Sequence, residues 1–269
     1  MSTPLEEIRH DLDAEQQALD ALVAALDPAA WATPTPSAGW AVRDQIAHLA
    51  HFDAVAAQAV TDPEGFARAV AAAVEDFPGY EARYLERGRA LAPADLLAWW
   101  RAARRRLAAA AATLEPKARV AWYGPPMSAM SFLSARLMET WLHGHDVTDA
   151  LGLERRETDR VRHILVLGVR TRAFSYALRG LPAPTAPVRV DLILPSGARW
   201  EDGEAGAENR IAGPAVDFCR VVTHRRHVDD TALLVEGPAA REWMLVAQAY
   251  AGPPAPGRKP GQFPRANPR

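Results

Sequence analysis

The chain has 269 residues, and its 31 lysines and arginines nearly balance its 33 aspartates and glutamates. The resulting formal net charge of −2 provides no strong positive field that would attract a nucleic acid or an anionic membrane. A single cysteine, Cys219, excludes both an internal disulfide and a metal site built from cysteines. Any metal would therefore be held by histidine, aspartate or glutamate, and the eight histidines are the first candidates.

Targeting and membrane-spanning patterns are not found in this sequence. Residues 1–7 lack the basic stretch and apolar core of a signal peptide, and no uninterrupted apolar run reaches the roughly 18 residues that span a bilayer. We therefore expect a cytoplasmic protein with neither a membrane nor a nucleic acid as its partner. The sequence does not determine the oligomeric state.

The first two-thirds of the chain has helical periodicity. Thr3, Pro4 and Glu6 form the pattern of a capping box with proline at the first helical position. Apolar residues then recur at helical spacing as far as Leu26, where Asp27 and Pro28 end the helix. Further helices are expected over residues 42–61, 64–75, 80–91, 93–114, 128–150 and 158–178.

The pattern changes after Pro182, where strands are expected. Residues 188–194 alternate between apolar and polar side chains, as a half-buried strand does. The remaining expected elements are strands at 198–201, 209–211 and 232–235, helices at 214–226 and 238–250, and an irregular tail from Gly252. We therefore expect a helical domain over residues 1–180 and a small α+β domain with an irregular tail over residues 181–269.

Three polar residues of the helical part have the chemistry of a metal site. Glu139 and His143 are four residues apart on an expected helix, so their side chains share one face. His48 lies among apolar residues of another helix, where an unpaired imidazole would be costly to bury. Two histidines and one glutamate would leave coordination positions open, as catalytic metal sites do. On spacing alone, a surface helix contact and a satisfied core histidine remain the commoner interpretations.

Two sequence motifs resemble a known family. Residues 39–49, Gly-Trp-Ala-Val-Arg-Asp-Gln-Ile-Ala-His-Leu, and residues 139–146, Glu-Thr-Trp-Leu-His-Gly-His-Asp, resemble the two metal motifs of the DinB-like family, in its mycothiol-dependent maleylpyruvate isomerase branch. The resemblance extends to about Leu178 and implies an up-down four-helix bundle. It also implies a divalent metal, with zinc the first expectation, held by His48, Glu139 and His143. Mycothiol is the thiol cofactor that it implies.

The C-terminal part resembles the small sterol-carrier-like domain that often follows this bundle. Residues 218–230 and 243–254 are similar to an actinobacterial subgroup of two-domain members that is named mainly for metal binding. The fold class that follows is a two-domain protein in which an all-α domain precedes a small α+β domain.

Several other side chains are candidates for supporting roles. His51 is expected beside the metal ligands or facing solvent. Asp146 is expected beside the ligands, where it either accepts the second ring proton of His143, or caps a helix or pairs with Arg136. His145 is a possible pocket wall. Arg220 and Arg225 either bind a carboxylate of the substrate or thiol, or belong to a solvated helix end. Cys219 lies in an apolar stretch, which favours a buried, inert thiol.

The leading functional hypothesis is an enzyme in which a metal activates a low-molecular-weight thiol for isomerisation or S-transfer on a small electrophilic substrate. The reactive group would be a metal-bound thiolate or water, and no side chain is assigned as the nucleophile. A hydrolase or Lewis-acid enzyme that needs no thiol is the second hypothesis. A non-catalytic metal-binding or small-molecule carrier protein is the third.

Overall fold

The computed structural model describes residues 3–182 and 184–263. It divides into two compact units, Met1–Arg155 and Arg156–Arg269, called the helical unit and the sheet unit below. Each unit is described by itself. The division lies before the boundary expected at residue 180, because α7 (Arg162–Arg170) packs against α9 (Ala215–Val222) and α8 (Arg172–Ala177) against α10 (Pro238–Val246).

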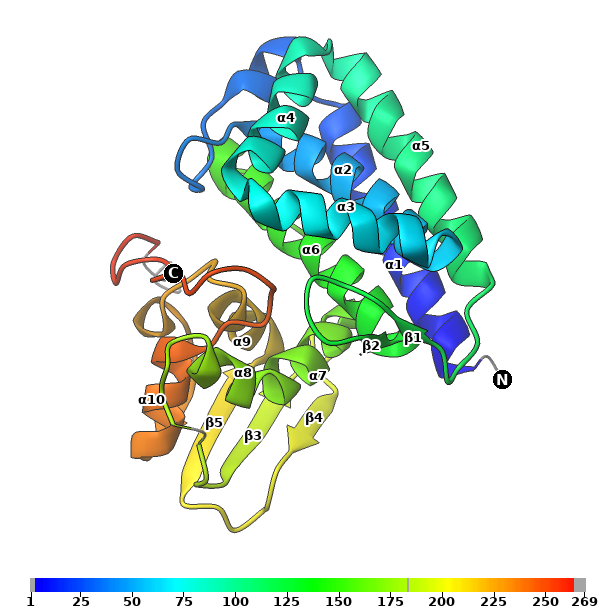
Figure 1. The fold of residues 1–269 in the computed structure, drawn as a ribbon. Coiled ribbons are helices and arrows are strands. Elements are labelled where there is room, and N and C mark those ends of the chain that lie inside the picture. Colours follow the sequence, from blue (N-terminus) through cyan, green and yellow to red (C-terminus); the bar gives the residue numbers. More distant parts are fainter. Residues whose placement is uncertain (1–2, 183, 264–269) are drawn as a thin grey trace. The chain divides into compact units, whose positions relative to one another are not determined.

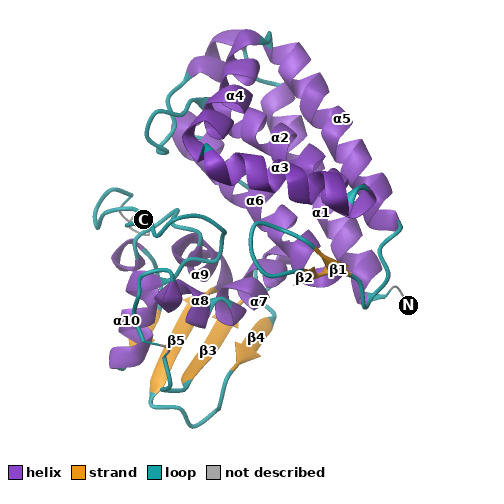
Figure 2. Cartoon of the chain, viewed as in Figure 1, coloured by secondary structure: helices purple, strands orange, loops and turns teal. Residues whose placement is uncertain are grey.

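The helical unit consists of six α-helices and a short hairpin within its described residues (Figures 1 and 2). The elements are α1 (Pro4–Ala24), the 3-10 helix η1 (Pro28–Ala32), α2 (Val42–Thr61), α3 (Pro63–Glu75), α4 (Phe77–Ala90), α5 (Pro93–Ala112), strands β1 (Arg119–Val120) and β2 (Met127–Ser128), and α6 (Ala129–Leu151). The hairpin of β1 and β2 was not expected from the sequence.

Local sequence signals account for where these helices begin and end. Thr3 and Glu6 make both hydrogen bonds of the expected capping box. Asp62 and Asp76 cap α3 and α4, in each case by accepting a hydrogen bond from the backbone N–H three residues on. Helix α6 ends at Gly152, whose left-handed backbone has a φ of 63°.

Helices α1, α2, α5 and α6 form the bundle, and α3 and α4 pack on α2 (Figure 1). The interior contains Ile46, Leu49 and Trp100, none of which is exposed. The chain directions are up, down, down, up, because α3 and α4 carry the chain back before α5 begins (Figure 1). The expected helical bundle is therefore confirmed, whereas the simple up-down alternation implied by the resemblance is not followed.

The sheet unit has the expected α+β composition. Its four strands are β3 (Val188–Ile193), β4 (Arg199–Asp202), β5 (Asn209–Pro214) and β6 (Leu234–Glu236), in the order β4-β3-β5-β6. Strands β3 and β5 are parallel, and the other neighbours are antiparallel. The described part of the tail after Gly252 contains neither helix nor strand, as expected, and its last residues lie outside the described ranges.

Three expected helices of the sheet unit are shorter than the sequence predicts, and the one expected at 238–250 ends at Val246. The helix expected at 158–178 is divided into the 3-10 helix η2 (Asp159–Val161), α7 and α8. The break lies at Thr171, whose hydroxyl donates to the carbonyls of Leu167 and Gly168 and so competes with the regular helix. Helix α9 ends at Val222 because His224 has a φ of 60°.

His224 gives the sheet unit a pH-dependent stability. Burial lowers the pKa of this imidazole from 6.5 to about 4. The unfolded chain therefore takes up a proton that the folded chain excludes, and stability present above pH 6.5 is lost as the pH falls toward 4. We expect this imidazole to contribute a loss of up to about 3 kcal/mol. His224→Asn tolerates the left-handed backbone and should have a flatter dependence in urea unfolding at pH 7 and 4.5; an unchanged pH dependence would contradict this account.

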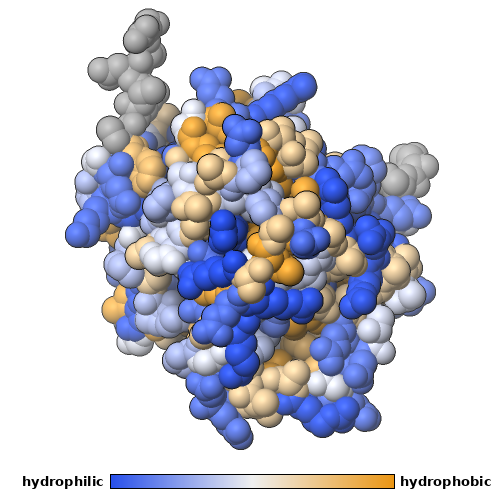
Figure 3. All heavy atoms as spheres, turned by 90° about the horizontal axis from the view of Figure 1, so that it is seen from above, coloured by the Kyte–Doolittle hydropathy of each residue, from blue (hydrophilic) through white to orange (hydrophobic). Residues whose placement is uncertain are grey.

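The surface is mixed in character. On the face shown in Figure 3, hydrophilic side chains alternate with small hydrophobic groups. Among the described residues, no helix is both long enough and apolar enough to cross a membrane.

Candidate metal centre

His48 of α2 and Glu139 and His143 of α6 meet inside the helical unit. Each contributes one possible ligand atom, and these atoms all lie within 4.8 Å of one another. Glu139 Oε2 is 3.4 Å from His48 Nε2 and 3.3 Å from His143 Nε2. Ligands 2.0–2.1 Å from a tetrahedral zinc ion lie about 3.3–3.4 Å apart. The donor types and these two distances therefore fit a zinc-sized cation.

Gln45 fixes the ring orientation of His143. Its Oε1 is 2.5 Å from His143 Nδ1, and its Nε2 donates to Thr35 Oγ1 at 2.8 Å. Because the amide nitrogen of Gln45 donates to Thr35, the oxygen is left to accept a proton from Nδ1. His143 therefore presents Nε2 toward Glu139, the arrangement that carboxamide or carbonyl partners impose on metal-binding imidazoles.

Tyr84 orients the ring of His48, as Gln45 orients the ring of His143. Its hydroxyl oxygen is 3.3 Å from His48 Nδ1, and the hydroxyl donates to Glu81 Oε1 at 3.4 Å. The Tyr84 oxygen is thereby left to accept from Nδ1, and Nε2 of His48 also faces Glu139. Burial raises the pKa of Tyr84, so its hydroxyl stays protonated at neutral pH.

The carboxyl group of Glu139 is ionised. Burial alone would raise its pKa, but the neighbouring imidazoles of His143 and His48 outweigh burial and hold the pKa well below its ordinary range. The centre thus combines one negative charge with two imidazole nitrogens, a set that suits zinc and other divalent ions.

Aromatic rings surround the two imidazoles. Trp40 stacks on His143 with ring centroids 5.9 Å apart and an interplanar angle of 11°. Phe52 lies against His48 at 4.5 Å, and Tyr84 meets His48 edge-on at 5.9 Å. These rings fix the imidazoles and give the centre apolar surroundings, in which electrostatic interactions are stronger than in water.

His51 flanks the centre and belongs to a chain of hydrogen bonds. Its Nε2 is 2.6 Å from the Tyr80 hydroxyl, which is 3.0 Å from the Tyr123 hydroxyl. Burial lowers the pKa of His51 to about 4 and raises the pKa values of Tyr80 and Tyr123. All three groups are therefore neutral at pH 7. Tyr123 belongs to the unexpected hairpin, so spacing within the helices gave no sign of this contact.

Asp146 and His145 lie on other faces of α6. Asp146 accepts a hydrogen bond from Ser37 Oγ at 2.9 Å, whereas the ring proton of His143 goes to Gln45. The alternative pairing of Asp146 with Arg136 is not what the structure has, because Arg136 binds Asp53. His145 is buried edge-on against Trp141, with ring centroids 4.1 Å apart.

Arg220, Arg225 and Cys219 belong to the sheet unit. Arg220 pairs with Asp217 at 3.2 Å and with Glu157 at 3.7 Å. Arg225 is buried and donates to the carbonyl of Thr223 at 2.7 Å. Cys219 is buried as expected, and burial raises its pKa well above the ordinary value. A thiol in that state is a poor nucleophile at neutral pH.

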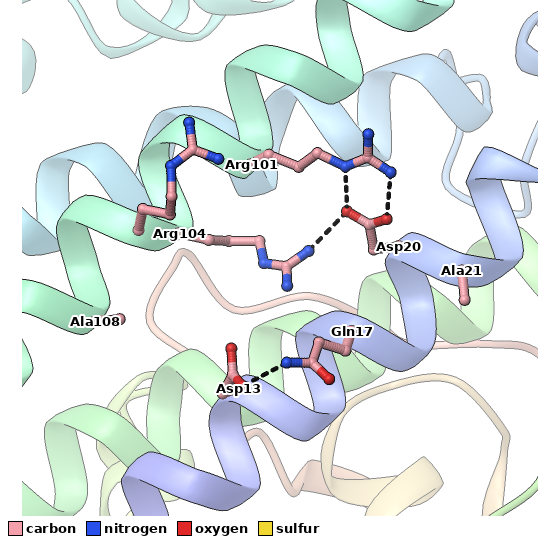
Figure 4. A pocket seen from close by; sticks show the side chains of 8 residues that line it. Asp13, Gln17, Asp20, Ala21, Arg101, Arg104 and Ala108 are labelled. Carbon is pink, nitrogen blue, oxygen red and sulfur yellow. Dashed lines mark hydrogen bonds and ion pairs between the residues drawn. The ribbon is translucent and has the colours of Figure 1, made fainter.

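A surface cavity of about 280 Å³ lies between α1 and α5 and shares no residue with the candidate metal centre (Figure 4). Asp20 accepts hydrogen bonds there from Arg101 and Arg104 at 2.7–2.8 Å. The acidic and basic side chains of this cavity largely neutralise one another, so it is not a strongly charged site.

Comparison with known proteins places the chain in a family. Residues 12–148 match the mycothiol maleylpyruvate isomerase N-terminal domain. The chain belongs to this family. Two uncharacterized proteins from two strains of Mycobacterium tuberculosis are each 46% identical over 92% of the chain and 96% of their own length. The resemblance seen in the two sequence motifs is thus confirmed.

The fold is also similar to that of solved members of the family. The crystal structure of a mycothiol-dependent maleylpyruvate isomerase has a TM-score of 0.59 at 17% identity. A histidine-to-alanine mutant of such an enzyme has a TM-score of 0.60 at 19% identity. Each match covers 89% of this chain and 98% of the solved one. The two-part architecture expected from the sequence is therefore confirmed.

Proposed function

We propose that this chain is a divalent-metal-dependent enzyme that uses mycothiol or a similar low-molecular-weight thiol. The reaction class is isomerisation of a small electrophilic substrate or S-transfer to it. The observation that carries the proposal is the convergence of His48 Nε2 and His143 Nε2 on Glu139 Oε2, at 3.4 and 3.3 Å. Membership of the mycothiol maleylpyruvate isomerase family supports the choice of thiol.

The three residues would hold the cation, and their neighbours would keep them oriented. Glu139 supplies the negative charge, and Gln45 and Tyr84 keep the two Nε2 atoms directed toward it. Three protein ligands leave room for an external ligand, as catalytic zinc sites require. When bound, zinc would lower the pKa of a thiol and so supply thiolate at neutral pH.

The reacting sulfur would come from outside the chain. Cys219 is the single cysteine of the sequence, and it is buried in the sheet unit with a raised pKa. An external thiol is therefore required for any sulfur chemistry at His48, Glu139 and His143. The aromatic residues around the centre would exclude water from the thiolate and reduce competing hydrolysis.

The Tyr80 and Tyr123 hydroxyls are suited to hold an oxygen atom of the substrate. Both are half-buried, neutral and fixed by the chain of hydrogen bonds that begins at His51. A phenol that stays protonated can donate to a carbonyl or carboxylate oxygen and stabilise charge that develops there. The substrate class that follows is a small compound with an electrophilic double bond next to a carbonyl group.

Gln45→Leu is expected to weaken zinc binding by about 10–100-fold, because the ring of His143 loses the acceptor that orients it. Leucine is similar in size but cannot accept a hydrogen bond. The measurement is competition for zinc with a chromophoric chelator. The control Gln17→Leu removes an exposed glutamine of α1 that donates a hydrogen bond to Asp13. Equal affinities of Gln45→Leu and the wild type would contradict the role assigned to Gln45.

The experiment that tests the proposed function combines elemental analysis with a turnover assay. Purified protein should contain about one equivalent of a divalent metal, as one three-ligand site implies. Turnover of maleylpyruvate, or of another unsaturated carbonyl compound, should require both the metal and mycothiol. Full activity without thiol would indicate a hydrolase or Lewis-acid enzyme instead. Bound metal with no turnover of any such compound would indicate a carrier or binding protein.

A further inference from the structure

Asp53 and Arg136 form an ion pair in the interior of the helical unit, away from the metal centre. Asp53 is fully buried, and Arg136 is 3% exposed. Asp53 Oδ1 accepts hydrogen bonds from Arg136 Nε at 3.1 Å and from Arg136 Nη2 at 2.9 Å. Asp53 Oδ2 accepts from Gln16 Nε2 at 3.1 Å and from Trp100 Nε1 at 3.0 Å. One carboxylate thus joins α1, α2, α5 and α6.

The energetics of buried charges indicate what such a pair contributes. Removing two charges from water costs several kcal/mol for each ion, and replacing a buried pair by apolar side chains is often neutral or stabilising. Stability alone therefore does not account for Asp53 and Arg136. What a buried pair imposes is one arrangement of its neighbours, because any other arrangement leaves a charge without a partner.

The position of the pair shows which arrangement it imposes. Polar contacts between the described residues of α2 and α6 include Gln45 with His143, His48 with Glu139, and Asp53 with Arg136. As the residue number rises along α2 from Gln45 to Asp53, the number of the partner on α6 falls from His143 to Arg136. All three contacts therefore belong to one antiparallel register. A slip by one helical turn would move α2 by about 5.4 Å along its axis and break all three contacts.

We propose that the Asp53–Arg136 pair is a positioning element that holds α2 and α6 in the register required for metal binding. Neither residue touches the ligand atoms, and the pair acts through the helices that carry His48, Glu139 and His143. This inference rests on the proposed metal function. It predicts that metal affinity depends on the pair more strongly than folding does.

The test is a double variant, Asp53→Asn with Arg136→Met, that removes both charges and conserves volume. The asparagine side chain still offers an oxygen to Gln16 and Trp100, so those donors keep an acceptor. The matched control, Asp20→Asn with Arg101→Gln, removes the ion pairs of Asp20 with Arg101 and Arg104, which join α1 to α5, and changes no residue of α2 or α6 (Figure 4). Zinc affinity and the urea unfolding midpoint are measured for the wild type, the double variant and the control.

We expect the double variant to unfold near the wild-type midpoint but to bind zinc at least 10-fold more weakly, whereas the control keeps its zinc affinity. In metal-free protein, the imidazole NMR signal of the His143 Nδ1 proton should be protected by Gln45 in the wild type and lost in the double variant. A folded double variant that keeps both the zinc affinity and this signal overturns the inference. Equal zinc losses in the double variant and the control also overturn it.

Two other outcomes need a separate interpretation: a double variant that does not fold, and a wild-type protein that binds no zinc. If the double variant does not fold, Arg136→Lys replaces it, because lysine keeps the charge but cannot make both hydrogen bonds to Asp53. Wild-type affinity and an unchanged His143 signal in Arg136→Lys would then overturn the inference. A wild-type protein that binds no zinc contradicts the proposed function, and the His143 signal, which needs no metal, still tests whether the pair sets the register.

Discussion

Glu139→Gln is expected to lower the affinity for zinc by at least about 100-fold, because it removes a charged ligand at the centre of the site. Glutamine has nearly the same shape, but its amide carries no charge to neutralise the cation. Both imidazoles now face a carboxylate oxygen, and in the variant they would face a neutral amide oxygen or an amide NH2 group. Zinc affinity by chelator competition and metal content by elemental analysis are the measurements.

Control variants show whether metal binding is lost only when a proposed ligand is replaced, or also when another histidine is replaced. His48→Ala and His143→Ala should lose metal in the same way as Glu139→Gln. His10→Ala should bind metal like the wild type, because the His10 side chain is 84% exposed on α1. Wild-type zinc affinity in Glu139→Gln, or equal losses in His10→Ala and His143→Ala, would exclude these residues as the ligand set.

Arg136→Ala is expected to lower the free energy of unfolding by about 3–5 kcal/mol, which is the typical cost of breaking a buried ion pair. Asp53 would keep its charge in the interior and lose both hydrogen bonds from the guanidinium. The measurement is urea unfolding followed by circular dichroism at pH 7. This single substitution is expected to be far more damaging than the double variant that removes both charges.

Arg83→Ala is the matched control. Arg83 is 62% exposed and makes one ion pair with Asp76 at 3.3 Å. Exposed pairs contribute roughly 0–1 kcal/mol, so this variant should unfold close to the wild type. An Arg136→Ala protein as stable as Arg83→Ala would mean that the buried pair imposes no constraint on the bundle, and the role assigned to it would be wrong.

Much of the helical unit could be predicted because its helix ends are marked in the sequence. Thr3, Asp62 and Gly152 act locally, and α2 spans the residues that its pattern predicted. The sheet unit shows where local signals fail. Thr171 interrupts a sequence that otherwise continues as helix, because the decisive hydrogen bonds of its hydroxyl are invisible to periodicity.

The candidate ligands could also be found in the sequence, but their partners could not. Glu139 and His143 share a helix face at a spacing of four residues, which requires no knowledge of tertiary structure. Gln45 lies three residues before His48, yet it contacts His143 on another helix. Such contacts depend on how α2 and α6 pack. A polar residue within an apolar helix, such as Gln45 or Asp53, is the one signal that could have pointed to them.

The most direct test of the central claim is titration of cobalt-substituted protein with mycothiol, followed by absorption spectroscopy. The account predicts a saturable sulfur-to-cobalt charge-transfer band in the wild type that is absent from His143→Ala and present in His10→Ala. A cobalt-loaded, folded wild-type protein that develops no such band with mycothiol would contradict the claim that His48, Glu139 and His143 form a thiol-activating metal centre.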